Sequence, residues 1–539
     1  MAVSDSPRSD DDALASPDDD ALSDDALIDE QERRQHDRDI RDLAGGALVV
    51  LFGKMARASR GAFIWVITLL CGLDVQGLYS LAWAVCSTLN KVARFGLPRG
   101  TVYFVNQARS SGDQVEQRQQ ASLAAGGLLA LVASGVVVCG LWWSADAIEA
   151  FYEKPIGDAM RVMVFTAPFV ALAWVFTSAT RALRIMRYEV YVRSVCGPAI
   201  LFAGGALVGL AGLGLFAIAW VQLIMAAGNF LLALVLFSRH FSIRGVLDAA
   251  KRHLPLRAVA RFSGPVMLTD LLYAVLTQLD VLMLGFFIVE IRYVGIYVIA
   301  RRLASIVLKA PQAFDAIFSS IASELAATER IEELGVKVLV VSRWVLTINL
   351  PIFASLLLVG EPILQTLGSK EFALASDMQL GLHILFILCV GMLVQSVFAV
   401  AEPLLAMTGR PGLNLFNNVV WLLGNFGLNL YLIPQYGLIG AAVGAMMTTM
   451  LINALRVSQI YLFRRILPFR STQLKPLLAA LVAIGPAWWL RQEQEELWLR
   501  MLVPTVSYFA TYILTLVMLG LEEEDRMLLG RLTRRWRRA

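Results

Sequence analysis

The chain has 539 residues, of which 57% are hydrophobic and only 17% charged, and its mean hydropathy is +0.63. Soluble domains carry about 25% charged residues, so this chain lacks the polar side chains to coat several soluble domains. This excludes a secreted enzyme, a soluble nucleotide-binding protein and a nucleic-acid binder. The composition predicts an all-α polytopic membrane protein.

Residues 1–42 form a distinct acidic segment, with fifteen Asp or Glu against five Arg, although the whole chain has a net charge of +4. The segment is rich in Asp, Ser and Ala and cannot bury enough apolar area to offset chain entropy, so we expect a disordered tail. It has no apolar stretch after a basic start and is therefore not a signal peptide. A docking segment for a partner is the alternative.

The rest of the chain divides into long apolar runs. A bilayer core needs about 20 apolar residues per helix, and runs of that length exclude a β-barrel. The sequence predicts about fourteen transmembrane helices, near residues 46–71, 77–105, 121–143, 159–180, 194–210, 214–237, 261–286, 293–322, 337–360, 378–404, 411–432, 437–462, 473–489 and 499–520. Turns are expected at 211–214 and at 434–437, and an external turn near Asp74.

Lys and Arg near the span ends set the expected orientation. The loops after even-numbered spans, with the C-terminus, hold 26 Lys or Arg, and the opposite loops hold five. By the positive-inside rule both termini are cytoplasmic. The outer loops are too short to fold as domains.

A weak internal repeat is visible. Gly77-Leu78-Tyr79 opens span 2 and Gly295-Ile296-Tyr297 opens span 8. The matching elements predict two six-helix lobes as parallel pseudo-repeats, an architecture of transporters, followed by two C-terminal helices. The expected organisation is a tail at 1–42, lobes at 43–240 and 241–465, helices 13 and 14 within 466–520, and a basic cytoplasmic tail at 521–539.

Charges inside the first lobe are all positive. Span 1 carries Lys54, Arg57 and Arg60 on one 120° arc, and span 2 carries Lys91 and Arg94. Ionisable groups at membrane depth are costly unless they face water or a partner, so we expect these cations to line water between the lobes. Snorkelling to the interface is the alternative, and it suits Lys54 best.

The second lobe carries both signs. Span 7 holds Asp270 and Asp280, while span 8 places Arg301, Arg302, Lys309 and Asp315 on one helical face. Two readings stay open: structural ion pairs that hold spans 7 and 8 together, or an ion-coupling site at the carboxylates.

No soluble-type catalytic motif and no cofactor site is recognisable. The sequence has no Walker A loop, no Rossmann glycine pattern and no HExxH, so we expect no enzyme activity and no metal. The five cysteines lie in apolar runs without metal spacing and are interpreted as small apolar side chains.

Five segments resemble elements of polysaccharide flippases in the same order along the chain. They are GLYSLA at Gly77–Ala82, FGL at Phe95–Leu97, LDVLMLG at Leu279–Gly285, ARRLA at Ala300–Ala304 and LIPQYGLIGAA at Leu432–Ala442. The chain thus resembles a Wzx-type O-antigen or exopolysaccharide flippase of the multidrug/oligosaccharidyl-lipid/polysaccharide (MOP) superfamily.

The resemblance implies a bacterial inner-membrane protein that moves polyprenyl (undecaprenyl) pyrophosphate-linked oligosaccharide to the outer leaflet by alternating access. Related lipid II flippases carry essential arginines in spans 1, 2 and 8. The positions that match by span are Arg57 or Arg60, Lys91 or Arg94, and Arg301 or Arg302. Membrane lipid and polysaccharide assembly proteins are the implied partners, with coupling to H+ or Na+ as an option. An ion-coupled multidrug exporter and a non-transporting scaffold are the alternative functions.

Overall fold

The computed structural model describes residues 59–109, 115–251, 254–309, 328–368, 375–407, 411–467 and 471–520, with the single residues 311, 312, 318, 322, 325 and 522. Side chains are not described at 59–62, 367, 368, 375, 407 and 411. These residues form helices joined by short turns, and the prediction of an all-α protein is confirmed. The predicted tails at 1–42 and 521–539 lie outside the described residues, except for residue 522.

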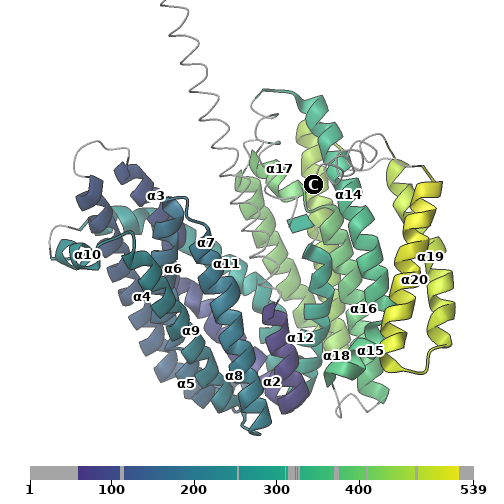
Figure 1. Cartoon of the computed structure of the whole chain (residues 1–539), viewed down its shortest axis with the longest axis horizontal. Coiled ribbons are helices and arrows are strands. Elements are labelled where there is room, and N and C mark those ends of the chain that lie inside the picture. The colour runs from purple at the N-terminus through teal and green to yellow at the C-terminus, as the bar shows by residue number, and fades with distance from the viewer. Residues whose placement is uncertain are drawn as a thin grey trace, which may run out of the picture.

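The first bundle contains the helices from α2 to α9 (Figure 1). Their bounds are α2 Ser59–Arg94, α3 Leu97–Arg109, α4 Val115–Tyr152, α5 Gly157–Met163, α6 Thr166–Ala182, α7 Arg187–Val190, the π-helix η1 Tyr191–Cys196, α8 Gly197–Leu210 and α9 Leu215–Ser238. The predicted turn at 211–214 is confirmed, because α8 ends and α9 begins on either side of it.

The second bundle follows a short helix, α10 Ile243–Ala249, and the long α11 Leu256–Phe287. Its helices are α12 Ile291–Ala304, the 3-10 helix η2 Ser305–Leu308, α14 Ile331–Leu358, α15 Gly360–Gly368, α16 Ala375–Val397, α17 Ala401–Met407 and α18 Pro411–Arg464. After η4 Ser471–Gln473, α19 Leu474–Gln492 and α20 Leu497–Met518 form a hairpin on the outer edge of this bundle (Figure 1).

Eleven helical segments in the described part are long and apolar enough to cross a membrane. Two of them, Phe63–Arg109 and Gly412–Arg464, have 47 and 53 residues, about twice the length that one crossing needs. Each contains a glycine with non-helical backbone angles, Gly72 or Gly437. The predicted total of fourteen helices stays a prediction, because span 8 and the start of span 1 lie partly outside the described residues.

Side-chain contacts show that both long segments reverse direction at these glycines. The rings of Phe63 and Tyr79 lie 5.5 Å apart, whereas sixteen residues of straight helix would separate them by about 24 Å. The amides of Asn417 and Gln459 exchange two hydrogen bonds of 2.8 Å across the bend at Gly437. The turn expected near Asp74 therefore occurs at Gly72, and the turn expected at 434–437 occurs at Gly437.

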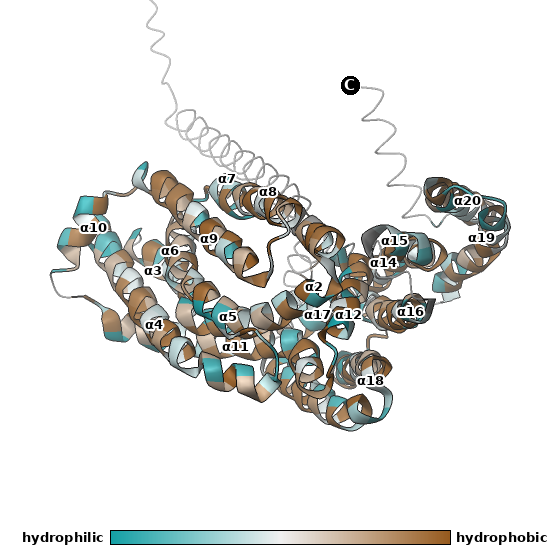
Figure 2. Ribbon diagram, turned by 90° about the horizontal axis from the view of Figure 1, so that it is seen from below, coloured by the Kyte–Doolittle hydropathy of each residue, from teal (hydrophilic) through white to brown (hydrophobic). Residues whose placement is uncertain are grey.

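Apolar side chains cover much of the outer surface. Figure 2 shows hydrophobic residues on the outward faces of both bundles. Trp143, Leu210 and Val136 are 84%, 77% and 67% exposed. A soluble monomer does not carry apolar patches of this extent, whereas a lipid bilayer solvates them without cost. The chain is a multi-pass membrane protein.

The two predicted repeats meet each other through their glycines. A Cβ atom added to Gly77 would overlap the carbonyl oxygen of Ile291, and one added to Gly295 would overlap that of Leu73. Gly77 and Gly295 occupy the same place in their repeats, four residues after Leu73 and Ile291. The reciprocal contact brings α2 and α12 together backbone to backbone, as a two-fold relation between parallel repeats requires.

Helix α11 links the bundles. It packs against α2, α3 and α4 of the first bundle and against α18 of the second. Near its start, the ring of Phe262 stacks on that of Tyr103 of α3 with 4.6 Å between ring centroids. Near its end, Asp280 contacts Asn429 of α18. Its two carboxylates, Asp270 and Asp280, therefore serve different bundles.

Candidate functional site: charged groups between the bundles

Two of the candidate residues, Arg57 and Asp315, lie outside the described residues. Arg60 lies in the first turn of α2, in the stretch whose side chains are not described. The predicted roles of these three residues therefore stay predictions.

Lys91 and Arg94 lie in the last turn of α2, and both are partly buried. The Nε of Arg94 donates to the carbonyl of Asn90 at 3.3 Å, and its guanidinium lies over the indole ring of Trp174 at 4.7 Å from the ring centroid. Neither cation makes an ion pair with any residue that the structure describes. Asp270 and Arg99 lie within electrostatic range of Lys91.

The helix ends after Arg94 because Phe95 and Gly96 both have positive φ, of 46° and 65°. A Cβ atom on Gly96 would overlap the carbonyl oxygen of Ser263, so only glycine allows α11 to approach this closely. The break turns α3 onto α11, and Arg99 in its first turn donates to Asp270 at 2.9 Å. Asp270 is thus the carboxylate of α11 that faces the cations of the first bundle.

Arg301 and Arg302 are adjacent on α12 but have different surroundings. Arg301 donates from Nη2 to the carbonyl of Thr277 at 2.5 Å and lies 3.8 Å from Asp280. Arg302 is exposed and makes no ion pair with the described residues, although α12 packs between α2 and α16. The hydroxyl of Tyr79 on α2 is within its electrostatic range.

Lys309 follows η2 and is exposed. The helical register changes before it, because Ser305–Leu308 is a 3-10 helix rather than a continuation of α12. The single face predicted for Arg301, Arg302, Lys309 and Asp315 assumed 100° per residue throughout, and a 3-10 helix rotates by about 120° per residue.

Asp280 is the centre of a buried polar network. Its carboxylate accepts hydrogen bonds from Tyr297 of α12 at 3.1 Å and from Asn429 of α18 at 3.0 Å, and Arg301 faces it. Only 6% of the Asp280 side chain is exposed. The network links α11, α12 and α18. It contains the ion pair between Asp280 and Arg301, which is expected if the charges of spans 7 and 8 form structural pairs.

Asp270 and Asp280 are not neighbours. They are ten residues apart on α11, about 15 Å along the helix axis. No group of three or more His, Cys, Asp or Glu side chains that could hold a metal ion occurs within the described ranges.

Sequence reasoning missed a cluster of charges in the first bundle. Glu189 of α7 pairs with Arg193 of η1 at 2.8 Å and with Arg181 of α6 at 3.3 Å. Arg181 also donates to the carbonyl of Pro98 at 3.0 Å, and the guanidinium of Arg193 lies over Trp174. The sequence assigned 181–193 to a loop, and its cations were counted only as an orientation signal.

A second missed pair lies in the second bundle. Arg456 of α18, whose side chain is 4% exposed, pairs with Glu402 of α17 at 3.0 Å. Its Nη2 also lies 3.5 Å from the side-chain oxygen of Asn418. The pair joins the second leg of α18 to α17. Arg456 follows a long uncharged run, which is the one sequence signal that could have marked it.

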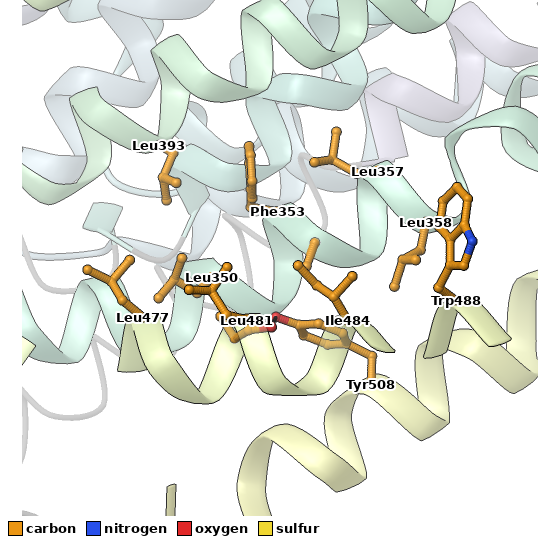
Figure 3. Close-up of a pocket in the computed structure, with 12 residues that line it drawn as sticks. Leu350, Phe353, Leu357, Leu358, Leu393, Leu477, Leu481, Ile484, Trp488 and Tyr508 are labelled. Atoms are coloured by element: carbon orange, nitrogen blue, oxygen red, sulfur yellow. Dashed lines mark hydrogen bonds between the residues drawn. The ribbon is translucent and has the colours of Figure 1, made fainter. Parts of the chain in front are cut away.

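A pocket of about 430 Å³ lies away from these charges, between α14, α16, α19 and α20. In Figure 3, side chains of α14 such as Phe353 lie opposite side chains of α19 such as Leu481. No Lys, Arg, Asp or Glu lines it. A pocket of this composition accepts hydrocarbon and excludes a charged head group.

Comparisons with known proteins agree with this architecture. The family of polysaccharide biosynthesis proteins matches residues 75–377, more than half of the chain. No curated protein sequence matches the chain. Among solved structures, the lipid II flippase MurJ in an inward closed conformation matches with a TM-score of 0.69 at 13% identity, over 87% of this chain and 97% of MurJ.

Multidrug transporters share the fold as well. An inward-facing MATE family transporter of the MOP superfamily matches with a TM-score of 0.64 at 15% identity, over 78% of this chain and 99% of its own. The MATE multidrug transporter DinF-BH matches with a TM-score of 0.57 at 17% identity, over 80% and 97% of the two chains. The chain therefore belongs to the polysaccharide biosynthesis protein family and has the fold of the lipid II flippase MurJ and of MATE transporters.

Proposed function

We propose that the protein is a flippase for polyprenyl-pyrophosphate-linked oligosaccharide, which it moves from the cytoplasmic to the outer leaflet of the bacterial inner membrane by alternating access. An undecaprenyl carrier is the proposed lipid, and polysaccharide assembly proteins are the proposed partners. The distribution of Lys and Arg supports a cytoplasmic position for both termini.

The observation that carries the proposal is a set of cations without carboxylate partners. Among the described residues, Lys91 and Arg94 of α2 and Arg302 of α12 make no ion pair, whereas Arg301, Arg456 and Arg193 do. The unpaired cations lie on the two helices that meet through Gly77 and Gly295. Both halves of the pseudo-repeat thus present positive charge near the interface between the bundles.

An anionic substrate accounts for this charge. Unpaired cations away from bulk water are costly, and a pyrophosphate offers several oxygens that guanidinium groups bind with paired hydrogen bonds. Arg supplies a planar fork and Lys a point charge, so Arg94 and Arg302 fit the phosphate oxygens and Lys91 adds attraction. We assign the pyrophosphate to these three residues, with Arg57, Arg60, Arg301 and Lys309 in supporting positions.

The hydrocarbon part of such a substrate needs an apolar path. The pocket beside α19 and α20 is lined by Leu, Ile, Ala, Phe, Trp and Tyr side chains and meets this requirement. A polyprenyl chain held there, or left in the bilayer, would leave only the pyrophosphate and its glycan to be shielded from hydrocarbon during the transfer.

An ion-coupled multidrug exporter is the second candidate, because MATE transporters share the fold. A cationic drug needs unpaired carboxylates, and in this chain Asp270 pairs with Arg99 and Asp280 with Arg301. The charge balance therefore favours an anion. A scaffold without transport activity would have no use for unpaired cations in both bundles.

Coupling to H+ or Na+ would use a carboxylate at membrane depth. Asp280 is the strongest candidate because it is buried and surrounded by side-chain oxygen and nitrogen groups, while Asp270 is partly exposed. Asp315 is the third candidate. Asp270 and Asp280 would have to exchange their protein partners for the ion during the cycle.

The test is the accumulation of lipid-linked glycan on the cytoplasmic leaflet of cells that carry Arg94→Ala or Arg302→Ala. Each change removes a charge-assisted contact of about 1.5–3 kcal/mol, so we expect flipping to fall by roughly tenfold to a hundredfold or more. The proteins should fold, because no ion pair is broken. Arg94→Lys and Arg302→Lys should recover part of the activity.

The matched control is Arg244→Ala, which removes an exposed cation of α10 that makes no ion pair with the described residues. It should flip at the normal rate. Normal glycan export by both Arg94→Ala and Arg302→Ala, at normal protein levels, would remove the main support for an anionic substrate.

A further inference from the structure

Trp174 of α6 contacts two arginines from different elements. The guanidinium of Arg94 at the end of α2 and that of Arg193 in η1 both lie over its indole ring. A cation over the face of an indole ring is attracted by the ring's quadrupole. The indole ring restricts both side chains. It also holds the two guanidinium groups close together, although their like charges repel each other.

The charge around this indole is unbalanced. Glu189 is shared by Arg181 and Arg193, and Asp270 lies within electrostatic range of Lys91 and Arg94 while it pairs with Arg99. In the described part of this bundle, these five cations therefore face two carboxylates. Partly buried like charges repel, so this excess of positive charge among the described residues favours the binding of an anion.

The backbone gives a second, independent indication. Arg193 lies in the π-helix Tyr191–Cys196, an insertion of the kind that is rare in proteins and occurs frequently at functional sites. The wider turn directs the Arg193 guanidinium to Glu189 and to the hydroxyl of Thr177 at 3.1 Å, beside Trp174. The π-helix replaces a regular α-helical turn, and it places the guanidinium of Arg193 on the indole beside that of Arg94.

We propose that Arg94, Arg193 and Trp174 form a phosphate-binding subsite inside the first bundle, separate from Arg302 and Arg301 of the second. The inference rests on the proposed function and specifies where its pyrophosphate is held. Arg94 and Arg193 bind phosphate oxygens through their guanidinium N–H groups. Trp174 is a positioning residue that fixes the directions of the two guanidinium planes.

Two subsites on opposite bundles suit alternating access. A pyrophosphate shared between Arg94 of the first bundle and Arg302 of the second would hold the bundles together, whereas transfer from one set to the other lets them separate. The first-bundle subsite retains the head group through its own arginines while the second bundle moves.

The test uses the purified full-length protein in phosphatidylcholine nanodiscs, with inorganic pyrophosphate as the probe in titration calorimetry. Arg193→Gln alone would leave Glu189 without one of its partners, so the double variant Glu189→Gln/Arg193→Gln is compared with the parent. Trp174→Leu keeps an apolar side chain but removes the indole ring. We expect the dissociation constant for pyrophosphate to rise about tenfold or more in both variants. The same measurements in an Arg302→Ala background isolate the first-bundle subsite.

The matched control is Arg187→Gln, which removes an exposed cation one turn before η1 that contacts only the neighbouring ring of Tyr188 in the described part of the chain. Its affinity should equal that of the parent. Unchanged pyrophosphate affinity in the double variant and in Trp174→Leu would overturn the subsite whatever their thermal stability. The proposed function would still stand if Arg302→Ala lost flipping.

A lipid head group is the other source of the same chemistry. Nanodiscs that contain phosphatidylglycerol separate the two sources. If the anionic lipid abolishes pyrophosphate binding to the parent, and the Trp174 and Arg193 variants relieve that competition, the subsite holds bilayer phosphate and its assignment to the substrate is overturned. If pyrophosphate binds equally in both discs, the assignment to the substrate is supported.

Discussion

At the scale of single residues, the carboxylate of Asp280 has the most demanding surroundings in the described part of the second bundle. It accepts hydrogen bonds from Tyr297 and Asn429, both fully buried, and it is the counter-charge of Arg301. A buried ion is tolerated only when its lone pairs and its charge are both satisfied. Asp280 therefore stabilises the packing of three helices even if it also binds an ion during transport.

Asp280→Asn should destabilise the protein. The amide keeps one acceptor oxygen but turns an NH2 group toward donors, and it leaves Arg301 without its carboxylate. An unsatisfied buried donor costs about 1–3 kcal/mol, so we expect the thermal unfolding midpoint in detergent to fall. Asp270→Asn is the matched control, because its pair with the 62% exposed Arg99 is worth about 0–1 kcal/mol.

The double variant Asp280→Asn/Arg301→Gln separates a structural role from ion coupling. Removing both charges should restore part of the stability, since the remaining charge was the main cost. A stable Asp280→Asn protein that no longer transports would contradict the structural role and make Asp280 the coupling carboxylate. A stable variant with normal transport would exclude Asp280 from both roles.

The residues that sequence could and could not identify differ in the range of their contacts. Asp280 and Arg301 were predictable as an ion pair, because consecutive spans pack together and charges at membrane depth need partners. Trp174 was not predictable, because an aromatic residue in an apolar run is typical of any membrane helix. Its contacts with Arg94 and Arg193 depend on the packing of α2, α6 and η1, which no local pattern encodes.

At the scale of the helices, the contact between α2 and α12 depends on two glycines. Gly77 and Gly295 lack the Cβ atoms that would overlap the carbonyl oxygens of Ile291 and Leu73. The close approach gains packing along α2 and α12, including Leu73, Ile296 and Ile299, all fully buried. The contact lies at the Gly72 turn, which the distribution of charge predicts to be on the outer side.

Gly77→Ala and Gly295→Ala should each destabilise this contact. A methyl group would meet backbone atoms that cannot move without separating the helices, and overpacking of this kind costs about 1–3 kcal/mol. We expect a lower unfolding midpoint for both variants. Gly127→Ala on α4 is the control, because no atom lies within 4 Å of its added Cβ and alanine favours a helix there. Equal midpoints for all three variants would contradict the close approach.

Helix boundaries were largely predictable because apolar runs and turn residues mark them. The interruptions of regular helix were not: neither η1 nor η2 contains a Gly or Pro that would mark it. A π-turn or a 3-10 turn differs from an α-turn by small changes in backbone angles that tertiary packing decides. Both interruptions involve cations of the proposed sites, because Arg193 lies in η1 and Lys309 follows η2.

At the scale of the whole molecule, further contacts join the bundles at the same end as the glycines. The ring of Phe151 of α4 stacks on Phe286 of α11 with 4.8 Å between centroids. Lys154, between α4 and α5, donates to the carbonyl of Val289 at 2.5 Å, between α11 and α12. In Figure 1 the bundles meet near the bottom of the view, where the label of α2 lies beside α12. These contacts join the bundles at the end that the distribution of charge predicts to be the outer one.

The glycine repeat predicted the relation between the bundles, but it did not predict the position of α11. Sequence counting assigns α11 to the second lobe. Its first half nevertheless packs on α3 and α4 through Phe262 and Val259, and only its second half joins α18. Helix α11 belongs to both bundles because its two halves carry different apolar faces and different carboxylates. This difference can be recognised only when the neighbouring helices are known.

Because the bundles are in contact at the predicted outer end, we expect the interface between them to be reached from the cytoplasmic side. Arg302→Cys, in a background with the five native cysteines replaced by alanine, should react with a membrane-impermeant maleimide in inside-out vesicles and much less in right-side-out cells. Arg302 is exposed, and a thiol there ionises and reacts only if water, rather than lipid, reaches it.

Two further variants are the controls. Val136→Cys, 67% exposed on the apolar surface of α4, should react from neither side, and Arg244→Cys on α10 should react only in inside-out vesicles. Equal labelling of Arg302→Cys from both sides would show that the outer end is open, and no labelling from either side would place Arg302 in lipid and exclude it from a water-filled path.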